Sequence, residues 1–181
     1  MKFVTVLVAC LFLLAGAAAA PQKLPWQSSD TPGGGAGQQL VHFLYPQQVT
    51  VQAGVPQTVE MHFRIANGLH INSHTPRQKS LIRTELIVAE PTGVKIATVD
   101  FPDGTDFAFP ADPSQKLSIY SGEFVLKMHV SAQRGDHLIQ GALRYQACDM
   151  TTCFPPRNAP VAVDVIAHQS LELRCRGSLP G

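Results

Sequence analysis

The sequence predicts an all-β protein built as an antiparallel β-sandwich. Apolar and polar residues alternate along several short runs, which is the period of a strand with one buried face. Glycine, proline and asparagine interrupt these runs at short intervals, as in chains that turn back between antiparallel strands. No stretch of about twelve residues repeats its apolar positions at the helical period. About seven or eight short strands at this spacing are typical of a two-sheet sandwich.

The clearest strand covers residues 59–65, where apolar side chains alternate with Glu60, His62 and Arg64. The pair Asn67-Gly68 follows it as a turn, and proline–glycine triplets end the next two runs. A later run leads directly into a cysteine, Cys148. In chain order, the predicted strands are 59–65, 81–89, 94–101, 123–130, 139–147 and 161–167.

The N-terminus has the composition of a secretory signal peptide, predicted over residues 1–20. Lys2 precedes an apolar run, 3–14, and a small-residue stretch, 15–20, follows it. The apolar run is too short for a comfortable membrane span, and no second apolar segment approaches that length. A competing interpretation treats residues 7–10 as a lipoprotein box, with acylation at Cys10. Either pattern predicts a periplasmic or secreted protein with no transmembrane segment after processing.

The remaining chain divides into a linker, one domain and a tail. Residues 21–39 are rich in Gly, Ser and Pro and predict a flexible linker. Residues 40–168 form the predicted domain, and residues 169–181, which include Cys175, a loose tail. Without Lys2, one of the 14 basic side chains, the charge balances the 13 acidic ones. No basic stripe is present, so nucleic acid is not an expected partner.

Two cysteines, Cys148 and Cys153, carry the clearest chemical signal. They flank a hairpin-sized loop that follows a strand-like run. Antiparallel neighbours approach to about 4.5–5.5 Å between Cα atoms, so a disulfide can form without moving the backbone. A bond closing so short a loop contributes about 2 kcal/mol through loop entropy, which suits a structural staple. Short-loop disulfides at exposed tips also exchange readily with thiols, so spacing alone leaves both roles open.

Several segments resemble a known family. Tyr-Gln-Ala-Cys at 145–148 precedes the cysteine loop, and Cys-Phe-Pro-Pro at 153–156 follows it. FRIANGLHIN at 63–72 and KLSIYSGE at 116–123 lie at corresponding places upstream. From about residue 40 to residue 167, the chain resembles the N-terminal periplasmic domain of the thiol:disulfide interchange protein DsbD. The cysteine motif is the highly specific part of this resemblance.

The resemblance implies an immunoglobulin-like sandwich whose cysteine pair relays electrons without a cofactor. The donor would be a thioredoxin-like protein, and the acceptors would be oxidised thiol proteins of the cell envelope. Cys153 would form the mixed disulfide with a partner, and Cys148 would resolve it. A cap loop at 106–113 would shield the pair with Phe107 or Phe109. The implied lining residues are His70, Asn72 and Tyr145.

The chain departs from the family in three respects. Its cysteine loop is one residue shorter than in the best-known members, and His70 and Asn72 stand where those members have tyrosine. The sequence holds neither a membrane-embedded electron carrier nor a thioredoxin-like Cys-x-x-Cys domain, so we expect a stand-alone version supplied by another protein. His70 is a candidate proton acceptor beside the pair.

Two other functions compete with the relay. The first is a non-catalytic binding or adaptor module, in which the same disulfide is only structural. The second is a metal chaperone that binds copper through the cysteines together with His70 and His74. Histidines four apart hold a metal together on a helix, and this segment has the composition of a loop, so no metal site is predicted.

Overall fold

The computed structural model describes residues 39–44, 47–109 and 112–169. These residues form strands, turns and loops, and no helix occurs among them. The part of the chain described therefore contains no helix that could cross a membrane. The predicted signal peptide, nearly all of the linker, the tail from residue 170, Cys10 and Cys175 lie outside the described residues.

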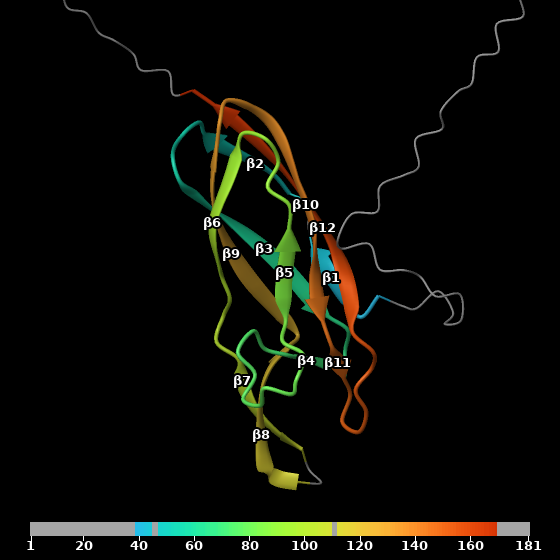
Figure 1. Cartoon of the computed structure of the whole chain (residues 1–181). Coiled ribbons are helices and arrows are strands. Elements are labelled where there is room, and N and C mark those ends of the chain that lie inside the picture. Colours follow the sequence, from blue (N-terminus) through green and yellow to red (C-terminus); the bar gives the residue numbers. More distant parts are fainter. Residues whose placement is uncertain (1–38, 45–46, 110–111, 170–181) are drawn as a thin grey trace, which may run out of the picture.

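Twelve strands make up the described domain, which is elongated in Figure 1. Their bounds are β1 (Val41–Leu44), β2 (Gln47–Gln52), β3 (Gln57–Ile65), β4 (His70–Asn72), β5 (Glu85–Val88), β6 (Val94–Asp100), β7 (Thr105–Phe109), β8 (Asp112–Ser121), β9 (Glu123–Ala132), β10 (Gly135–Tyr145), β11 (Ala147–Cys148) and β12 (Arg157–His168).

The strands form three four-stranded sheets. Two of them, in the orders β1-β3-β9-β6 and β2-β12-β10-β5, are the layers of an immunoglobulin-like sandwich, which confirms the predicted fold class. The third sheet, β11-β4-β8-β7, extends one end of the sandwich (Figure 1). All strand pairs are antiparallel except β2 with β12, which is parallel and was not predicted.

The core lies between the two main sheets and follows from the alternation in the sequence. The inward residues of β3, from Val59 to Ile65, are each at most 2% exposed. The ring of Phe63 lies 5.3 Å from those of Phe43 and Phe124, centroid to centroid. Every second residue of β9, β10 and β12 completes this cluster. Full burial of each large apolar side chain stabilises the fold by about 1.5–3 kcal/mol.

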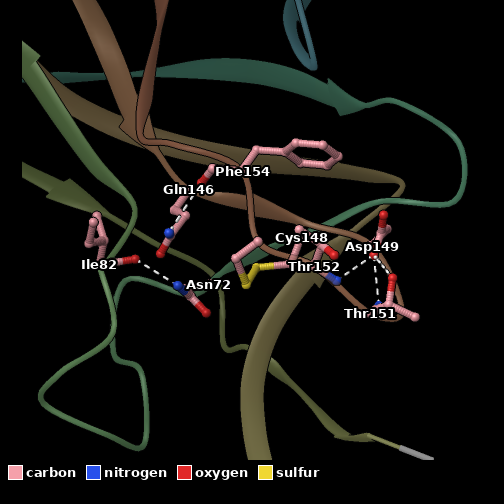
Figure 2. The surroundings of a disulfide bond; sticks show 9 residues. Asn72, Ile82, Gln146, Cys148, Asp149, Thr151, Thr152 and Phe154 are labelled. Carbon is pink, nitrogen blue, oxygen red and sulfur yellow. Dashed lines mark hydrogen bonds between the residues drawn. A yellow bond between two sulfur atoms is a disulfide. The ribbon is translucent and has the colours of Figure 1, made fainter.

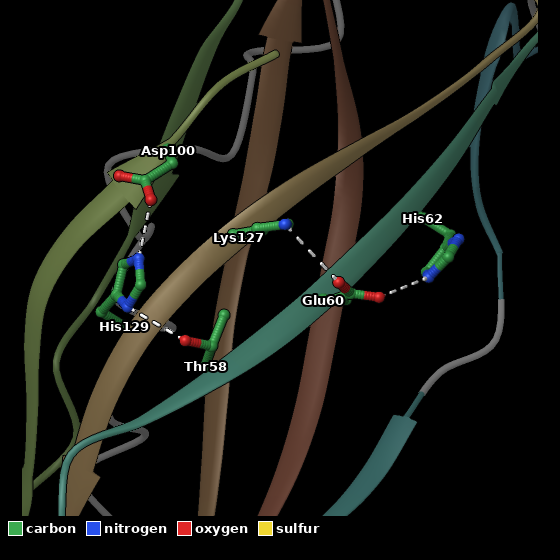
Figure 3. A network of polar contacts seen from close by, with 6 residues as sticks. All are labelled: Thr58, Glu60, His62, Asp100, Lys127 and His129. Atoms are coloured by element: carbon green, nitrogen blue, oxygen red, sulfur yellow. Dashed lines mark hydrogen bonds and ion pairs between the residues drawn. The ribbon is translucent and has the colours of Figure 1, made fainter.

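The outer face of the first sheet carries solvated polar pairs instead. His129 contacts Asp100 at 2.7 Å and Thr58 at 3.1 Å, while Glu60 lies 3.7 Å from His62 and 4.0 Å from Lys127 (Figure 3). The members of these pairs come from β3, β6 and β9, which are hydrogen-bonded neighbours. Exposed ion pairs of this kind contribute only about 0–1 kcal/mol each.

The six predicted strands are all present, with shifted bounds. The largest correction concerns 81–89, of which only β5 is strand. Residues 82–84 form no strand. Thr84 instead bonds to the end of β4 and the residue after it: its hydroxyl donates to the carbonyl oxygen of Asn72 at 2.5 Å, and its amide to the carbonyl oxygen of Ser73 at 3.2 Å. The run 139–147 is divided between β10 and β11 at Gln146.

Five strands were not predicted from the sequence: β1, β2, β4, β7 and β8. The described residues of the segment expected as a cap loop, 106–109 and 112–113, belong to the paired strands β7 and β8. The hairpin register shifts between Ala108 and Phe109, which is an irregularity of the bulge type. Figure 1 shows this hairpin at the same end of the molecule as the loop after β11.

Candidate functional site

The predicted disulfide between Cys148 and Cys153 is present at the end of the sandwich that carries the third sheet (Figure 2). Their sulfur atoms are 2.03 Å apart and their Cα atoms 4.0 Å apart. Cys148 ends β11, and the two cysteines pair as an isolated antiparallel bridge. The antiparallel pairing expected from the loop length is present, with a Cα separation of 4.0 Å that is shorter than the expected value of about 4.5–5.5 Å.

The two cysteines differ sharply in exposure. Cys148 is 1% exposed and ends β11, which pairs with β4 at the edge of the third sheet. Cys153 follows the loop and is exposed to solvent. Its neighbours in the loop are exposed as well, and Met150 has 49% of its surface accessible. Of the two cysteines, Cys153 is therefore the one that solvent reaches.

Asp149 holds the loop between the cysteines in shape. Its Oδ1 atom accepts hydrogen bonds from the amide of Thr151 at 2.7 Å, the hydroxyl of Thr151 at 2.9 Å and the amide of Thr152 at 2.6 Å (Figure 2). These bonds hold the pKa of Asp149 below its ordinary value, with a smaller contribution from His70. Because these bonds join Thr151 and Thr152 to the residue after Cys148, they fix the course of the loop that leads to Cys153.

Backbone bonds close the base of the same loop. The amide of Asp149 donates to the carbonyl of Thr152 at 2.9 Å, and the amide of Phe154 donates to Ala147 at 2.8 Å. The side-chain amide of Gln146 also donates to the carbonyl of Phe154, at 3.2 Å (Figure 2). The chain after Cys153 is thereby tied back to the strand that ends at Cys148.

His70 and Phe107 lie on the same face of the third sheet as the disulfide. His70 of β4 is the register partner of Cys148, and Cys148 is in turn the register partner of Cys153. Following the register through β8 places Phe107 of β7 on this face too. The rings of His70 and Phe107 are 4.7 Å apart, centroid to centroid, and His70 is 4% exposed.

The environment of His70 favours its neutral form. Burial lowers the pKa of His70 below its ordinary value of 6.5, and the carboxylate of Asp149 partly opposes this effect. The imidazole is therefore predominantly neutral at pH 7. A neutral imidazole has one ring nitrogen able to accept a proton.

Asn72 fastens β4 to the segment that precedes β5. It is 1% exposed, and its side-chain amide donates to the carbonyl of Ile82 at 2.9 Å (Figure 2). The next residue, Ser73, donates its hydroxyl to that of Ser118 on β8, at 2.9 Å. These bonds hold β4, and with it His70, in a fixed place beneath the cysteines.

The β7–β8 hairpin is tied to the chain after β4 by an ion pair between Arg77 and Asp106. The Nε atom of Arg77 donates to Oδ1 of Asp106 at 3.2 Å, and its Nη2 atom also donates to that oxygen. The guanidinium holds the pKa of Asp106 below its ordinary value. Because both side chains are half exposed, this pair is a weak tether for the hairpin.

Comparisons with known proteins add two solved structures. No protein-family model matches the chain, and no curated protein does. The chain is similar to the N-terminal periplasmic domain of ScsB from Proteus mirabilis, with 13% identity and a TM-score of 0.46 over 64% of this chain. It covers 43% of that chain, less than half its length. It is also similar to the reduced N-terminal domain of Neisseria meningitidis DsbD, with 16% identity and a TM-score of 0.38. That match covers 57% of this chain and 74% of the other.

Similarities of this size carry no conclusion about function. The fold assignment rests on the strand order and the burial pattern, and the site rests on the geometry of the cysteines. Among the residues that the structure describes, no group of three or more His, Cys, Asp and Glu side chains is placed to hold a metal ion.

The predicted site residues fall into three groups. Cys148, Cys153, His70 and Phe107 come together at the third sheet, and Asn72 supports them. Tyr145 lies in the core and is 1% exposed. Burial raises the pKa of its phenol, and hydrogen bonds between the phenol and the backbone of Leu40 and Val41 partly oppose this rise. Its assignment as a lining residue stays a prediction. The side chain of Phe109 lies outside the described part.

Two residues of the site were missed in the sequence, Asp149 and Arg77. The signal for Asp149 was available, because an aspartate followed by two threonines is typical of a turn in which the carboxylate accepts backbone hydrogen bonds. Arg77 could not be recognised as a site residue from the sequence, because its partner Asp106 lies on a hairpin that the sequence pattern does not reveal.

Proposed function

We propose that this domain is a thiol–disulfide exchange module that passes two electrons through the Cys148–Cys153 pair. The observation that carries the proposal is the unequal exposure of the two cysteine residues: Cys153 is exposed to solvent and Cys148 is 1% exposed. Exchange through a mixed disulfide needs one accessible sulfur and a second thiol held beside it. A purely structural bond has no need of this asymmetry.

In the reducing direction, the thiolate of Cys153 attacks a sulfur of the partner's disulfide. The partner's sulfur–sulfur bond breaks, a mixed disulfide forms, and the first partner sulfur leaves as a thiolate. Cys148 then loses its proton and attacks Sγ of Cys153. The Cys148–Cys153 bond forms, the second partner sulfur leaves as a thiolate, and both partner thiolates take up protons. The module ends oxidised and the partner reduced.

The electron donor in this proposal is a thioredoxin-like protein, and the acceptors are oxidised thiol proteins of the cell envelope. The cysteine motif supports this assignment through its resemblance to the DsbD N-terminal domain family. The N-terminal segment supports a periplasmic or secreted location through its signal-peptide composition. The sulfur chemistry itself needs no cofactor.

Single-cysteine variants test the proposal. In the full chain with Cys10→Ser and Cys175→Ser, we expect the thiol left by Cys148→Ser to react with an aromatic disulfide probe at least about tenfold faster than the thiol left by Cys153→Ser, because access limits exchange. In guanidinium chloride, where the fold is lost, the two variants should react alike. Equal rates in the folded chains would contradict the assignment of Cys153 as the attacked sulfur.

One observation favours the alternative of a binding module with a structural disulfide. The three hydrogen bonds to Asp149 hold the cysteine loop in one shape, as a staple requires. The alternative predicts that the isolated oxidised chain exchanges with neither small thiols nor thioredoxin under conditions in which it stays folded. Exchange of the folded, oxidised chain with reduced thioredoxin would exclude it.

A further inference from the structure

We propose that His70 is the proton acceptor for the buried thiol of Cys148 when that thiol resolves the mixed disulfide on Cys153. The inference rests on the proposed function and assigns the proton-transfer step within it. Burial of Cys148 makes a proton acceptor within the protein necessary. Only the thiolate attacks a disulfide, and a thiol removed from water has no solvent base beside it.

Position supports the assignment first. His70 and Cys148 are directly opposite each other on the antiparallel strands β4 and β11. Opposite residues project to the same face with Cβ atoms about 4.5–5.5 Å apart, which is within reach of a proton transfer, directly or through one water. Because β4 is fastened by Asn72 and Ser73, His70 keeps this place when the disulfide opens.

The surroundings of His70 suit a base. The register partner of His70 on β8 is Ser121, and β7 presents the apolar ring of Phe107. On the side of β11, the facing groups are the cysteines and the carboxylate of Asp149. The charged groups of the hairpin, Asp106 and Lys116, lie on the opposite face of the sheet by register.

Electrostatics agrees with this role. Burial lowers the pKa of His70, so the ring is neutral and able to accept a proton at pH 7. The nearby carboxylate of Asp149 favours the imidazolium that forms during the step. A base, the group that gives up its proton and a carboxylate that stabilises the charged base recur together in enzymes that activate nucleophiles.

In the resolving step, His70 takes the proton of Cys148 as the Cys148 sulfur attacks Sγ of Cys153. The bond between Cys148 and Cys153 forms, and the bond from Cys153 to the partner sulfur breaks. The partner sulfur leaves with the electron pair and receives a proton from the His70 imidazolium or from water. In the opposite direction, the imidazolium protonates Cys148 as that residue leaves the opened disulfide.

A single-turnover experiment separates this step from the first. The reduced full chain with Cys10→Ser and Cys175→Ser is mixed with excess dithio-bis-nitrobenzoate, which releases one coloured thiolate when Cys153 attacks and a second when Cys148 resolves. We expect His70→Gln to leave the first phase unchanged and to slow the second by at least about tenfold, in the lower range of general base catalysis. We also expect it to flatten the fall of the second phase between about pH 7 and 5.

The matched control is His62→Gln, a histidine on the outer face of β3, which should change neither phase. If the parent chain with Cys10→Ser and Cys175→Ser shows both phases and adding His70→Gln changes neither, His70 is not the acceptor, while the proposed function stands. If that parent chain releases no second thiolate, the exchange function itself fails, and this inference fails with it.

A second measurement applies if His70→Gln does not fold. The pKa of His70 is measured in the reduced wild-type chain from the NMR shift of its ring Cε1 proton. The second-phase rate of the same protein should fall with decreasing pH with a midpoint at that pKa. A second phase that shows no inflection there would overturn the assignment.

Discussion

At the scale of single residues, the loop between the cysteines depends on one carboxylate. Asp149 accepts three hydrogen bonds from Thr151 and Thr152, and its charge acts on the buried His70. In the proposed exchange, Cys148 and Cys153 carry the redox chemistry, and Asp149 shapes the loop that joins them. Two predictions belong to this scale.

The first concerns Asp149. Hydrogen bonding lowers its folded-state pKa below the ordinary 3.8, so its contribution to stability is complete above that value and is lost as the pH falls through the folded pKa. We expect Asp149→Ala to lower the Tm of the oxidised chain at pH 7 and to have little effect at about pH 2. Thermal unfolding followed by circular dichroism measures both. Asp164→Ala, on the outer face of β12, is the control, and an equal loss of Tm in that variant would contradict a special role for Asp149.

The second concerns His70. Its folded-state pKa lies below the unfolded value of 6.5, so the unfolded chain binds the proton more readily. Stability is therefore complete above about pH 6.5 and falls as the pH decreases from 6.5 toward the folded pKa. Urea unfolding at pH 7.5 and 5.5 should show this loss in the wild-type chain and a smaller one in His70→Gln. The same pH dependence in both proteins would show that His70 is not the group responsible.

At the scale of elements, the short strand β4 and the hairpin of β7 and β8 build the site around the cysteines. β4 contributes the residue opposite Cys148, and the hairpin contributes the ring that covers that residue. The β8 strand of the hairpin is anchored by its pairing with β4 and by Tyr120, which stacks on Phe124 in the core. The β7 strand, which carries Phe107, is tied to the chain after β4 by the exposed pair of Arg77 and Asp106. We therefore expect β7 to be easier to displace than the main sheets.

Removing the ring of Phe107 should uncover His70, the residue opposite Cys148, and so open the buried side of the disulfide. An aromatic contact contributes about 0.5–1.5 kcal/mol, so we expect Phe107→Ala to speed reduction of the disulfide by dithiothreitol by about two- to tenfold. The stopped-flow rate of thiol appearance is the measurement. Leu138→Ala, on the outer face of β10, should leave the rate unchanged. A rate for Phe107→Ala equal to that of the wild-type chain would mean that the ring does not limit access.

The main sheets should respond differently. Phe63 is fully buried and packs against Phe43 and Phe124, so Phe63→Ala leaves a cavity and should cost about 3–5 kcal/mol of unfolding free energy. The measurement is urea unfolding of the oxidised chain. A loss below about 1 kcal/mol would mean that the sheets do not pack around this ring.

At the scale of the whole molecule, the features that could be predicted from the sequence are those that follow from hydrophobic periodicity and from loop length. The alternation in β3 and β9 predicted the core, and the four residues between the cysteines predicted the disulfide. β4 has only three residues, too few for a period to appear. The parallel pairing of β2 with β12 joins residues far apart in the chain, and no local pattern reports it.

The sequence could not decide whether Phe107 or Phe109 shields the cysteines, again because strand pairing leaves no local pattern. Which of two aromatic residues faces the cysteines depends on the register between β7 and β8, and the shift after Ala108 is not visible in the sequence. Tyr145 stands three residues before Cys148, yet its burial in the core follows from its place on β10 rather than from that proximity.

The equilibrium reduction potential of the Cys148–Cys153 pair tests the central claim most directly. The full chain with Cys10→Ser and Cys175→Ser is equilibrated with glutathione or dithiothreitol over a range of ratios, and the oxidised fraction is measured after alkylation. An exchange module must lie between thioredoxin-like reductants and strong periplasmic oxidants, about −270 to −120 mV, and this is the result we expect. A potential below about −300 mV would mark a structural disulfide and contradict the proposed function.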